Sequence, residues 1–524
     1  MGKVRNILFI MADQLRADYL SCAGHPSLET PHIDGLAARG VRFTRAYTQS
    51  PICGPSRMSF YTGRYMFSHG STWNNIPLKL GELTMGDYLR PLGLRTVLVG
   101  KTHFKADVEE MARLGLDPAS PDGVLMGECG FEPFERDDGL HTHVSYDPNL
   151  AYNVWLREKG YESDNPWHDF ANAAEGLDGE ILSGWNMRNC HLPARVREEH
   201  SETAYMTDRA LAFMEEAGDT PWCAHLSYIK PHWPYMAPDP YHAMYGKDQV
   251  LPAVRSDAER ESPHPVVAAF MRHEESENFQ REEVRQNVIP TYMGLVKQID
   301  DHLGRLFSAM EAHGRMDDTM IVFTSDHGDY LGDHWLGEKE LFHEASARIP
   351  MIVYDPDQAS DGTRGSADDR LVEAIDLLPT FVDVLGGEAQ PHRLEGRSLL
   401  PLLRNGHVDD WRDAVFSEGD YAVRHARLDL GLAPDEARSF MVRNERWKYI
   451  HYENFRPQLF DLVEDPDELV DLGESPAHDA VCAEMHERLF AWMRARRLRT
   501  TLSDDEVANR TGSGKKRGYF IGVW

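Results

Sequence analysis

The segment that begins at Cys53 carries the residue with the clearest chemical potential in the chain. Pro55 suits a first helical turn and Gly63 suits the position just past a helix end, so the sequence predicts a short helix that starts near Cys53. Free N–H groups and the helix dipole favour negative charge at such a start. A lone cysteine is more often a small buried hydrophobe, so Cys53 needs other groups around it to count as a nucleophile.

Four apolar runs elsewhere end in polar or charged side chains. The runs lack alternation, which is typical of parallel strands buried on both faces, and they span Asn6–Ala12, Arg95–Gly100, Trp222–Ile229 and Met320–Thr324. They are followed, in order, by Asp13-Gln14, Lys101-Thr102-His103, Lys230-Pro231-His232 and Ser325-Asp326-His327-Gly328. Because ligands in open α/β sheets bind beyond the carboxyl ends of the strands, we expect these side chains to share one site.

Helical patterns lie between the predicted strands and indicate a doubly wound α/β domain over residues 1–396. Within it, the stretch from residue 108 to residue 200 fits an insertion of loops and short helices. The predicted helices span His32–Arg39, Glu202–Glu216 and Tyr292–His313, and Ile349–Tyr354 is a further predicted parallel strand.

The chain changes character after residue 396. We expect a smaller α+β domain over residues 397–500, because the pattern there favours a hairpin, another short strand and an amphipathic helix. These elements span Arg438–His451 with a turn at Asn444-Glu445-Arg446, Gln458–Leu462 and Pro476–Arg497. The tail, residues 501–524, ends in an apolar run and is expected to pack on the domain or on a neighbouring subunit.

Composition excludes several classes of protein. The 524 residues carry a formal net charge of −30, so a general nucleic-acid binder is not expected. The six cysteines are scattered without a CxxC pair and do not predict a disulfide framework. Neither a secretory signal nor an apolar run of the ~20 residues needed to span a bilayer is present, which favours a cytoplasmic protein without membrane contact.

The pattern Cys-x-Pro-Ser-Arg at 53–57, followed by Thr-Gly-Arg at 62–64, resembles the signature of sulfatases in the alkaline phosphatase superfamily. Asp13, Lys101, His103, the 325–328 segment and Lys339 follow the same order as in that family. The resemblance implies a large mixed, mostly parallel sheet sandwiched by helices, with a smaller C-terminal α+β domain. It also implies that a maturation enzyme oxidises Cys53 to formylglycine, which is hydrated in the active site.

The resemblance further implies one divalent metal ion, held by Asp13, Asp326, His327 and the formylglycine at position 53. Two departures from the family pattern affect this site. Gln14 stands where relatives often have a second Asp, and His327 stands where many calcium-bearing relatives have Asn. Because an imidazole suits Mn²⁺ better than Ca²⁺, which prefers oxygen, Mn²⁺ is favoured and Ca²⁺ stays possible.

The resemblance assigns the remaining site residues to a cationic clamp around the substrate. Arg57 would hold the hydrated aldehyde and the metal-site carboxylates, and Asn74 and Thr102 are candidate substrate contacts. A clamp of fixed cations would stabilise the charge that builds as the ester bond breaks, and we favour His232 over His103 as the acid for the leaving alcohol. The clamp residues are Lys101, His103, His232 and Lys339. No role is predicted for His141, His143, His334 or His343.

Two branches of the family compete for the substrate. The strand end Gly100-Lys101-Thr102-His103 is similar to that of sulfate-ester hydrolases, and the stretch 74–78 is similar to phosphonate monoester and phosphodiester hydrolases. We expect hydrolysis of sulfate monoesters through a covalent sulfo-enzyme intermediate, with promiscuity, and the phosphonate or phosphodiester activity is the alternative. Relatives in this branch are commonly oligomers, which implies a homodimer or a homotetramer.

Two further readings stay open from the sequence. In one, a metal-dependent phosphatase or phosphomutase uses an unmodified Cys53. In the other, a scaffold without activity only binds sulfated ligands, although a binder has no need of a metal-activated nucleophile.

Overall fold

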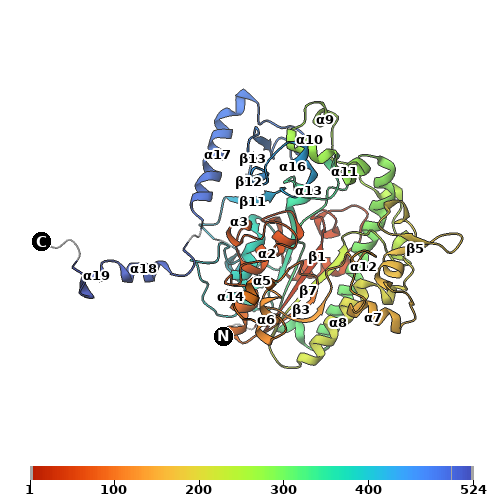
Figure 1. Ribbon diagram of the computed structural model, residues 1–524, viewed down its shortest axis with the longest axis horizontal. Helices are drawn as coiled ribbons and strands as arrows, with labels where there is room; N and C mark the ends of the chain where they lie inside the picture. The colour runs from red at the N-terminus through yellow and green to blue at the C-terminus, as the bar shows by residue number, and fades with distance from the viewer. Residues whose placement is uncertain (1–3, 407, 497–498, 521–524) are drawn as a thin grey trace.

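A computed structural model describes residues 4–406, 408–496 and 499–520. Its centre is an eight-stranded sheet with the strand order β10-β2-β9-β8-β1-β7-β3-β4 (Figure 1). The strands are β1 (Asn6–Asp13), β2 (Val41–Tyr47), β3 (Arg95–Gly100), β4 (Glu132–Arg136), β7 (Trp222–Pro231), β8 (Thr319–Thr324), β9 (Arg348–Tyr354) and β10 (Ser366–Glu373). The predicted large, mostly parallel sheet is therefore confirmed.

Strand β9 corrects one prediction. Its position as a buried strand agrees with the sequence, but it pairs antiparallel with both β2 and β8, whereas the other neighbouring strands of this sheet pair parallel. Helices cover both faces of the sheet here, so the strand is apolar throughout whichever way it runs. The apolar run predicts burial and carries no information about direction.

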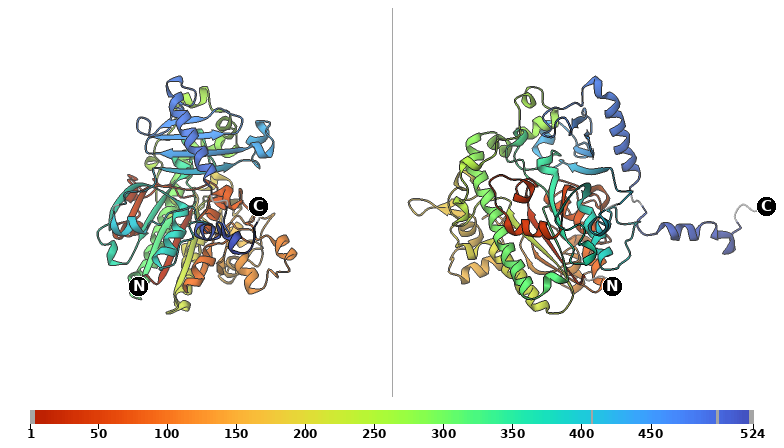
Figure 2. Two further views of the ribbon diagram at one scale, coloured as in Figure 1. Left: turned by 90° about the vertical axis from the view of Figure 1, so that its left-hand side faces the viewer. Right: turned by 180° about the vertical axis from the view of Figure 1, so that it is seen from behind.

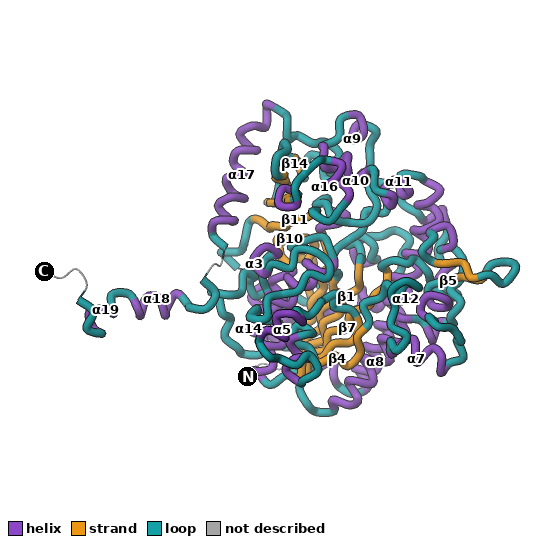
Figure 3. Tube along the Cα trace, viewed as in Figure 1, coloured by secondary structure: helices purple, strands orange, loops and turns teal. Residues whose placement is uncertain are grey.

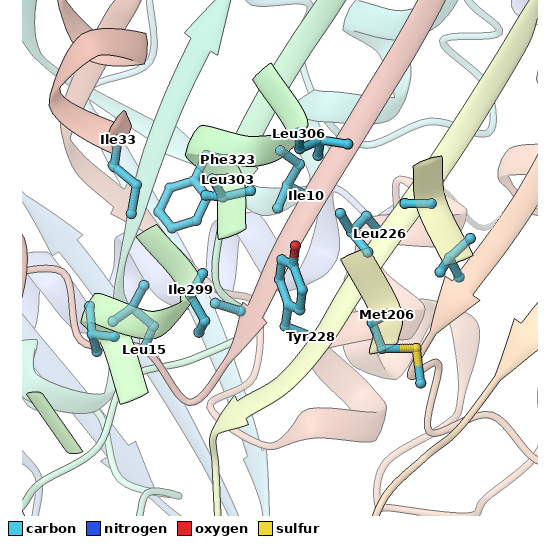
Figure 4. Close-up of a cluster of buried hydrophobic side chains, with 14 of the residues drawn as sticks. Ile10, Leu15, Ile33, Met206, Leu226, Tyr228, Ile299, Leu303, Leu306 and Phe323 are labelled. Carbon is cyan, nitrogen blue, oxygen red and sulfur yellow. The ribbon is translucent and has the colours of Figure 1, made fainter. Parts of the chain in front are cut away.

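Helices cover both faces of the sheet. Successive residues of β1 point to opposite faces, so they pack against different sets of helices. Leu8 and Ile10 face a cluster formed with α1 (Pro31–Arg39), α8 (Glu202–Ala217) and α12 (Glu282–Ala312), part of which Figure 4 shows. Phe9 and Met11 face a second cluster, formed with α2 (Cys53–Thr62), α4 (Met85–Leu89), α14 (Leu377–Val384) and α15 (Leu400–Asn405). Helix α12 begins before the predicted Tyr292 and includes Pro290.

A separate four-stranded antiparallel sheet forms the C-terminal α+β domain, which lies above the large sheet in the left view of Figure 2. Its strands are β11 (Ala414–Asp420), β12 (Arg438–Asn444), β13 (Trp447–Tyr452) and β14 (Gln458–Asp461), and α17 (Asp479–Arg494) packs against β12 and β13. The predicted hairpin, its turn, the short strand and the helix are all present. The domain boundaries after residues 396 and 500 stay predictions.

The predicted insertion over residues 108–200 consists mainly of loops and short helices (Figure 3). It also contains β4, which pairs with β3 at the edge of the large sheet, so the prediction missed one strand of that sheet. It includes α5 (Val108–Arg113), α6 (Pro121–Met126), α7 (Ala151–Glu158), the π-helix η3 (Trp167–Ala171) and the hairpin of β5 (Ala173–Glu175) and β6 (Ile181–Ser183). Other short helices are α3 (Met66–His69), α9 (Ala258–Glu261), α10 (Pro265–Met271), α11 (Glu274–Phe279), α13 (Glu344–Ala347) and α16 (His425–Asp429).

The tail carries α18 (Asp504–Arg510) and α19 (Ser513–Lys516), which project away from the body in Figures 1 and 2. Of the apolar run at its end, Tyr519 and Phe520 are exposed, and residues 521–524 lie outside the described residues. The predicted contact of this run with a domain or subunit stays a prediction. Among the described helices, none combines the length and the apolar character that a membrane crossing requires.

Candidate active site

Four buried side chains converge at the carboxyl edge of the large sheet. Cys53 is the first residue of α2, Asp13 ends β1, and Asp326 and His327 lie just beyond β8. Cys53 Sγ lies 3.1 Å from His327 Nε2 and 3.7 Å from Asp13 Oδ1. His327 Nε2 lies 3.7 Å from Asp326 Oδ1 and 3.9 Å from Asp13 Oδ1. The structure thus brings together the four residues that the sequence predicts as metal ligands, and we call them the donor cluster.

The donor cluster presents its atoms in a form that a divalent ion can use. His327 Nδ1 donates to Gly328 O at 2.8 Å, so Nε2 is the ring nitrogen that faces the other three donors and could bind a metal ion. Arg57 donates to Oδ2 of both Asp13 and Asp326, and Oδ1 of each is the oxygen nearer to His327. Two carboxylate oxygens and an imidazole nitrogen make a suitable donor set for a metal ion.

Arg57 is fully buried, and each of its three nitrogens has a partner. Nε lies 2.9 Å from Asp326 Oδ2, and Nη2 lies 3.0 Å from Asp13 Oδ2. Nη1 donates to Lys101 O at 2.8 Å and to Ser227 Oγ at 2.7 Å. The planar guanidinium therefore fixes the spacing and orientation of both carboxylates.

Two lysines complete a cationic ring around position 53. Lys101 Nζ lies 2.6 Å from Asp13 Oδ2, and Lys339 Nζ lies 3.5 Å from Cys53 Sγ. Burial by itself raises the pKa of the Cys53 thiol, but Lys339, Lys101 and His327 together hold that pKa well below its ordinary value. The site therefore stabilises an anion at position 53.

The loop after β3 places the side chains of 102 and 103. The backbone N–H groups of Thr102 and His103 donate to Asp138 Oδ1 at 3.0 and 2.9 Å, and His103 adopts a left-handed conformation with φ of 54°. The His103 side chain lies close enough to Cys53 to make a small contribution to the lowered pKa of the thiol. The Thr102 hydroxyl accepts from Phe104 N at 3.3 Å, so its described contact is within the loop.

His232 and Asn74 approach the site from other elements. His232 Nδ1 donates to Trp233 O at 2.9 Å, so Nε2 is the ring nitrogen left for other contacts, and the His232 ring is close enough to Asp13 to lower the pKa of that carboxyl. In Asp13, burial opposes this effect, and Lys101 contributes more than His232 does. Asn74 Oδ1 accepts from the N–H of Gly54 at 2.7 Å, so Asn74 helps to hold the start of α2.

Sequence reasoning missed Asp329 and Tyr235, which fix Gln14. Gln14 Nε2 donates to Asp329 Oδ2 at 2.5 Å, and Gln14 Oε1 accepts from Lys339 Nζ at 2.9 Å. Tyr235 OH also donates to Asp329 Oδ2, at 2.6 Å. Burial raises the pKa of Asp329. The Gln14 amide thus orients Lys339 toward position 53. Asp329 could have been noticed because it lies two residues beyond His327, whereas Tyr235 gives no local signal.

Oxygen and nitrogen donors that meet where a nucleophile's helix begins define a metal-dependent hydrolase. The chain belongs to the sulfatase family, which matches residues 5–387, within the alkaline phosphatase superfamily. A second family match, described as N-sulphoglucosamine sulphohydrolase, C-terminal, covers residues 332–495. The sulfatase family generally uses a metal ion and formylglycine, and the buried donor cluster fits such a site.

Three relatives indicate where the chain lies within the family. It is 31% identical to the multifunctional alkaline phosphatase superfamily protein PehA of Trinickia caryophylli, over 93% of this chain and 95% of that protein. It is 28% identical to an arylsulfatase of Clostridium perfringens, over 90% of each chain. The solved phosphonate monoester hydrolase of Silicibacter pomeroyi is 28% identical and superposes with a TM-score of 0.81 over 95% of this chain and 97% of that one.

Proposed function

We propose that the chain hydrolyses sulfate monoesters by means of a formylglycine made from Cys53, a divalent metal ion and a covalent sulfo-enzyme intermediate. The observation that carries this proposal is the position of Cys53 Sγ, which lies 3.1 Å from His327 Nε2 and 3.5 Å from Lys339 Nζ. In the mature enzyme, Sγ is replaced by the oxygens of the hydrated aldehyde. The metal ion and the aldehyde would supply a nucleophile that works at neutral pH.

The residues around the nucleophile account for binding an anionic ester. Arg57, Lys101 and Lys339 place three fixed cations around position 53, although the chain carries a net charge of −30. Lys339 also pairs with Glu338 at 3.2 Å. Lys101 and Lys339 would bind the ester oxygens that gain charge as the bond breaks, a contribution worth about 10²–10³-fold per donor. His232 would give its proton to the departing alcohol.

A second candidate activity is the hydrolysis of phosphonate monoesters or phosphodiesters with the same formylglycine. It is supported by the likeness to the phosphonate monoester hydrolase of Silicibacter pomeroyi, at a TM-score of 0.81. Sulfate monoesters and phosphate diesters are both tetrahedral and singly charged, so one cationic centre can accept both. We favour the sulfate ester because the strand end at 100–103 resembles that of sulfate-ester hydrolases.

The experiment that decides between the two activities compares kcat/KM for an aryl sulfate, a phosphonate monoester and a phosphodiester with the same leaving group. The protein is fully matured and carries one defined metal. We expect the largest kcat/KM for the aryl sulfate and measurable activity on the other two. A larger kcat/KM for either phosphorus ester would assign the primary activity to the second candidate, and no turnover of any ester would contradict both.

The metal is proposed to be Mn²⁺, because His327 contributes an imidazole nitrogen to the donor cluster. We predict that His327→Asn lowers the affinity for Mn²⁺ by about 10-fold or more and leaves the affinity for Ca²⁺ unchanged or higher. Titration of the metal-free protein with each ion measures both dissociation constants. Equal losses of affinity for Mn²⁺ and Ca²⁺ would show that the imidazole does not set the preference.

The proposal also requires partners. A maturation enzyme must oxidise Cys53, and a small anionic ester is the substrate.

We further propose a homo-oligomer, a dimer or a tetramer, in which the apolar end of the tail contacts a neighbouring subunit. Light scattering of the full chain beside a form truncated after residue 500 tests this assembly, and equal molar masses per particle would contradict a role of the tail.

A further inference from the structure

A second group of metal-binding side chains lies in the insertion, apart from the donor cluster. His143 Nε2 and His168 Nδ1 lie 3.0 and 3.1 Å from the same oxygen, Oδ1 of Asp169. The two imidazole rings are 4.0 Å apart between centroids. His168 and Asp169 belong to the π-helix η3, which leads directly into β5 near the right-hand edge of Figure 1, whereas β1 lies at the centre. π-Helical turns are rare in proteins, and those that do occur are often found at functional sites.

The carboxylate at the centre of this group needs a positive partner. Asp169 is buried, with its side chain 12% exposed, and within the described part of the chain its carboxylate forms ion pairs with the two histidines and with no lysine or arginine. A buried carboxylate is costly unless a cation or hydrogen bonds balance it. The Arg195 guanidinium donates to the backbone oxygen of Asp169 at 2.7 Å and forms no ion pair with its carboxylate, so among the described groups protonated imidazoles or a bound cation would supply that charge.

A comparison with another cluster of similar residues supports this distinction. His32, Asp300 and Asp301 also lie close together, but Lys297 Nζ lies 3.2 Å from Asp300 and 2.5 Å from Asp301. The lysine already balances those two carboxylates. No lysine or arginine of the described ranges forms an ion pair with Asp169, so its group is the stronger candidate for a metal ion.

The spacing of the three donor atoms is close to what a small cation requires. Bonds of about 2.0–2.2 Å in a tetrahedral zinc site place neighbouring donor atoms about 3.3–3.5 Å apart. The nitrogen–oxygen separations of 3.0 and 3.1 Å therefore need to widen by only a few tenths of an ångström, and the two nitrogens lie within 4.8 Å of each other. His143 and Asp169 also line a surface hollow, from which an ion and a water ligand can enter.

We propose that His143 Nε2, His168 Nδ1 and Asp169 Oδ1 form a second divalent-metal site, suited to Zn²⁺, with water completing the coordination. Two imidazoles and one carboxylate are ligands that Zn²⁺ favours, and neither thiolates nor the many oxygens that Ca²⁺ prefers are present in the group. The site is distinct from the catalytic donor cluster and does not depend on the proposed ester hydrolysis.

The second site would fasten the insertion to the strand that carries a catalytic histidine. Asn172, the residue after η3, accepts from Lys230 Nζ at 2.7 Å through its side-chain oxygen. Lys230 lies at the end of β7, two residues before His232. A metal ion that joins the loop of His143 to η3 would therefore stabilise the hydrogen bond between Asn172 and Lys230, and with it the chain segment that carries His232.

The test measures zinc stoichiometry on the full chain after removal of metal. Equilibrium dialysis against Zn²⁺ is expected to give one equivalent more for the wild type than for His143→Ala, whose side chain is 55% exposed in the native chain and expendable for folding. His313→Ala, at an exposed position at the end of α12, is the matched control and should bind as much zinc as the wild type.

A diffraction experiment on zinc-soaked crystals removes any dependence on the variants. Data collected at the zinc absorption edge should show an anomalous peak between the three donor atoms. Equal zinc binding by the wild type and His143→Ala, or no peak at this position while the donor cluster shows one, would overturn the proposal and leave a hydrogen-bonded His–Asp–His group. Loss of the catalytic activity alone has no bearing on this outcome.

Discussion

Cys53→Ala is expected to lower kcat/KM for the best ester substrate by on the order of 10⁴-fold or more, since removal of a nucleophile costs that much or more in other hydrolases. The substitution deletes one buried sulfur atom and leaves the carboxylates, Arg57 and the lysines in place. The thermal midpoint should therefore change little, whereas the metal content should fall, because position 53 provides one of the four proposed ligands. Steady-state kinetics, thermal unfolding and metal analysis of the same preparation check the three expectations.

The chemical form of residue 53 must be measured beside the activity. Peptide mass spectrometry reports the fraction in which an aldehyde has replaced the thiol, and we expect kcat to rise in proportion to that fraction when the maturation enzyme is co-expressed. Cys482→Ala, in α17 of the C-terminal domain, is the matched control and should retain full activity. Full activity in protein with an intact thiol at position 53 would instead support the phosphatase reading with unmodified cysteine.

The sequence predicts the strands that carry the site better than it predicts the rest of the sheet. β1, β3, β7 and β8 each contain a run of apolar residues and are buried along nearly their whole length, so their burial is visible in the residues themselves. Strands β2, β4 and β10 escaped notice, because Arg42 and Arg45 interrupt the first, the edge strand β4 is mostly polar, and β10 is polar over its first half at the other edge of the sheet. Tertiary pairing, not local pattern, makes them strands.

The candidate site shows the same difference between residues that have a local sequence signal and residues that have none. Asp13, Asp326 and His327 follow buried strands directly, and a polar residue at such a strand end is a local signal that needs no knowledge of other segments. Ser227 and Tyr235 carry no such signal, because each acts by contacting a side chain that is far away in the sequence. The members of the donor cluster and Arg57 were thus predicted, whereas Ser227, Tyr235 and Asp329, which hold the site from distant segments or through Gln14, were not.

Arg57 is the orienting group whose loss should be most harmful after that of Cys53. Its guanidinium holds Oδ2 of both Asp13 and Asp326, and a lysine at this position can reach only one of them with comparable geometry. Arg57→Ala leaves the buried Asp326 without its guanidinium partner and Asp13 with Lys101 as its remaining cation, which costs about 3–5 kcal/mol in the free energy of unfolding. Misplaced ligands are expected to weaken metal binding by about 10–100-fold.

A comparison of three variants separates the contribution of Arg57 to folding stability from its role in orienting the two aspartates. Arg412→Ala also breaks buried ion pairs, with Glu373 and Asp376, so it should unfold more easily than the wild type while its metal affinity stays unchanged. Arg57→Lys keeps the charge, so it should recover stability relative to Arg57→Ala and still show a weakened metal affinity and a lower kcat. If Arg57→Lys binds metal and turns over like the wild type, charge alone suffices, and the bridging geometry of the guanidinium has no role in orienting the two aspartates.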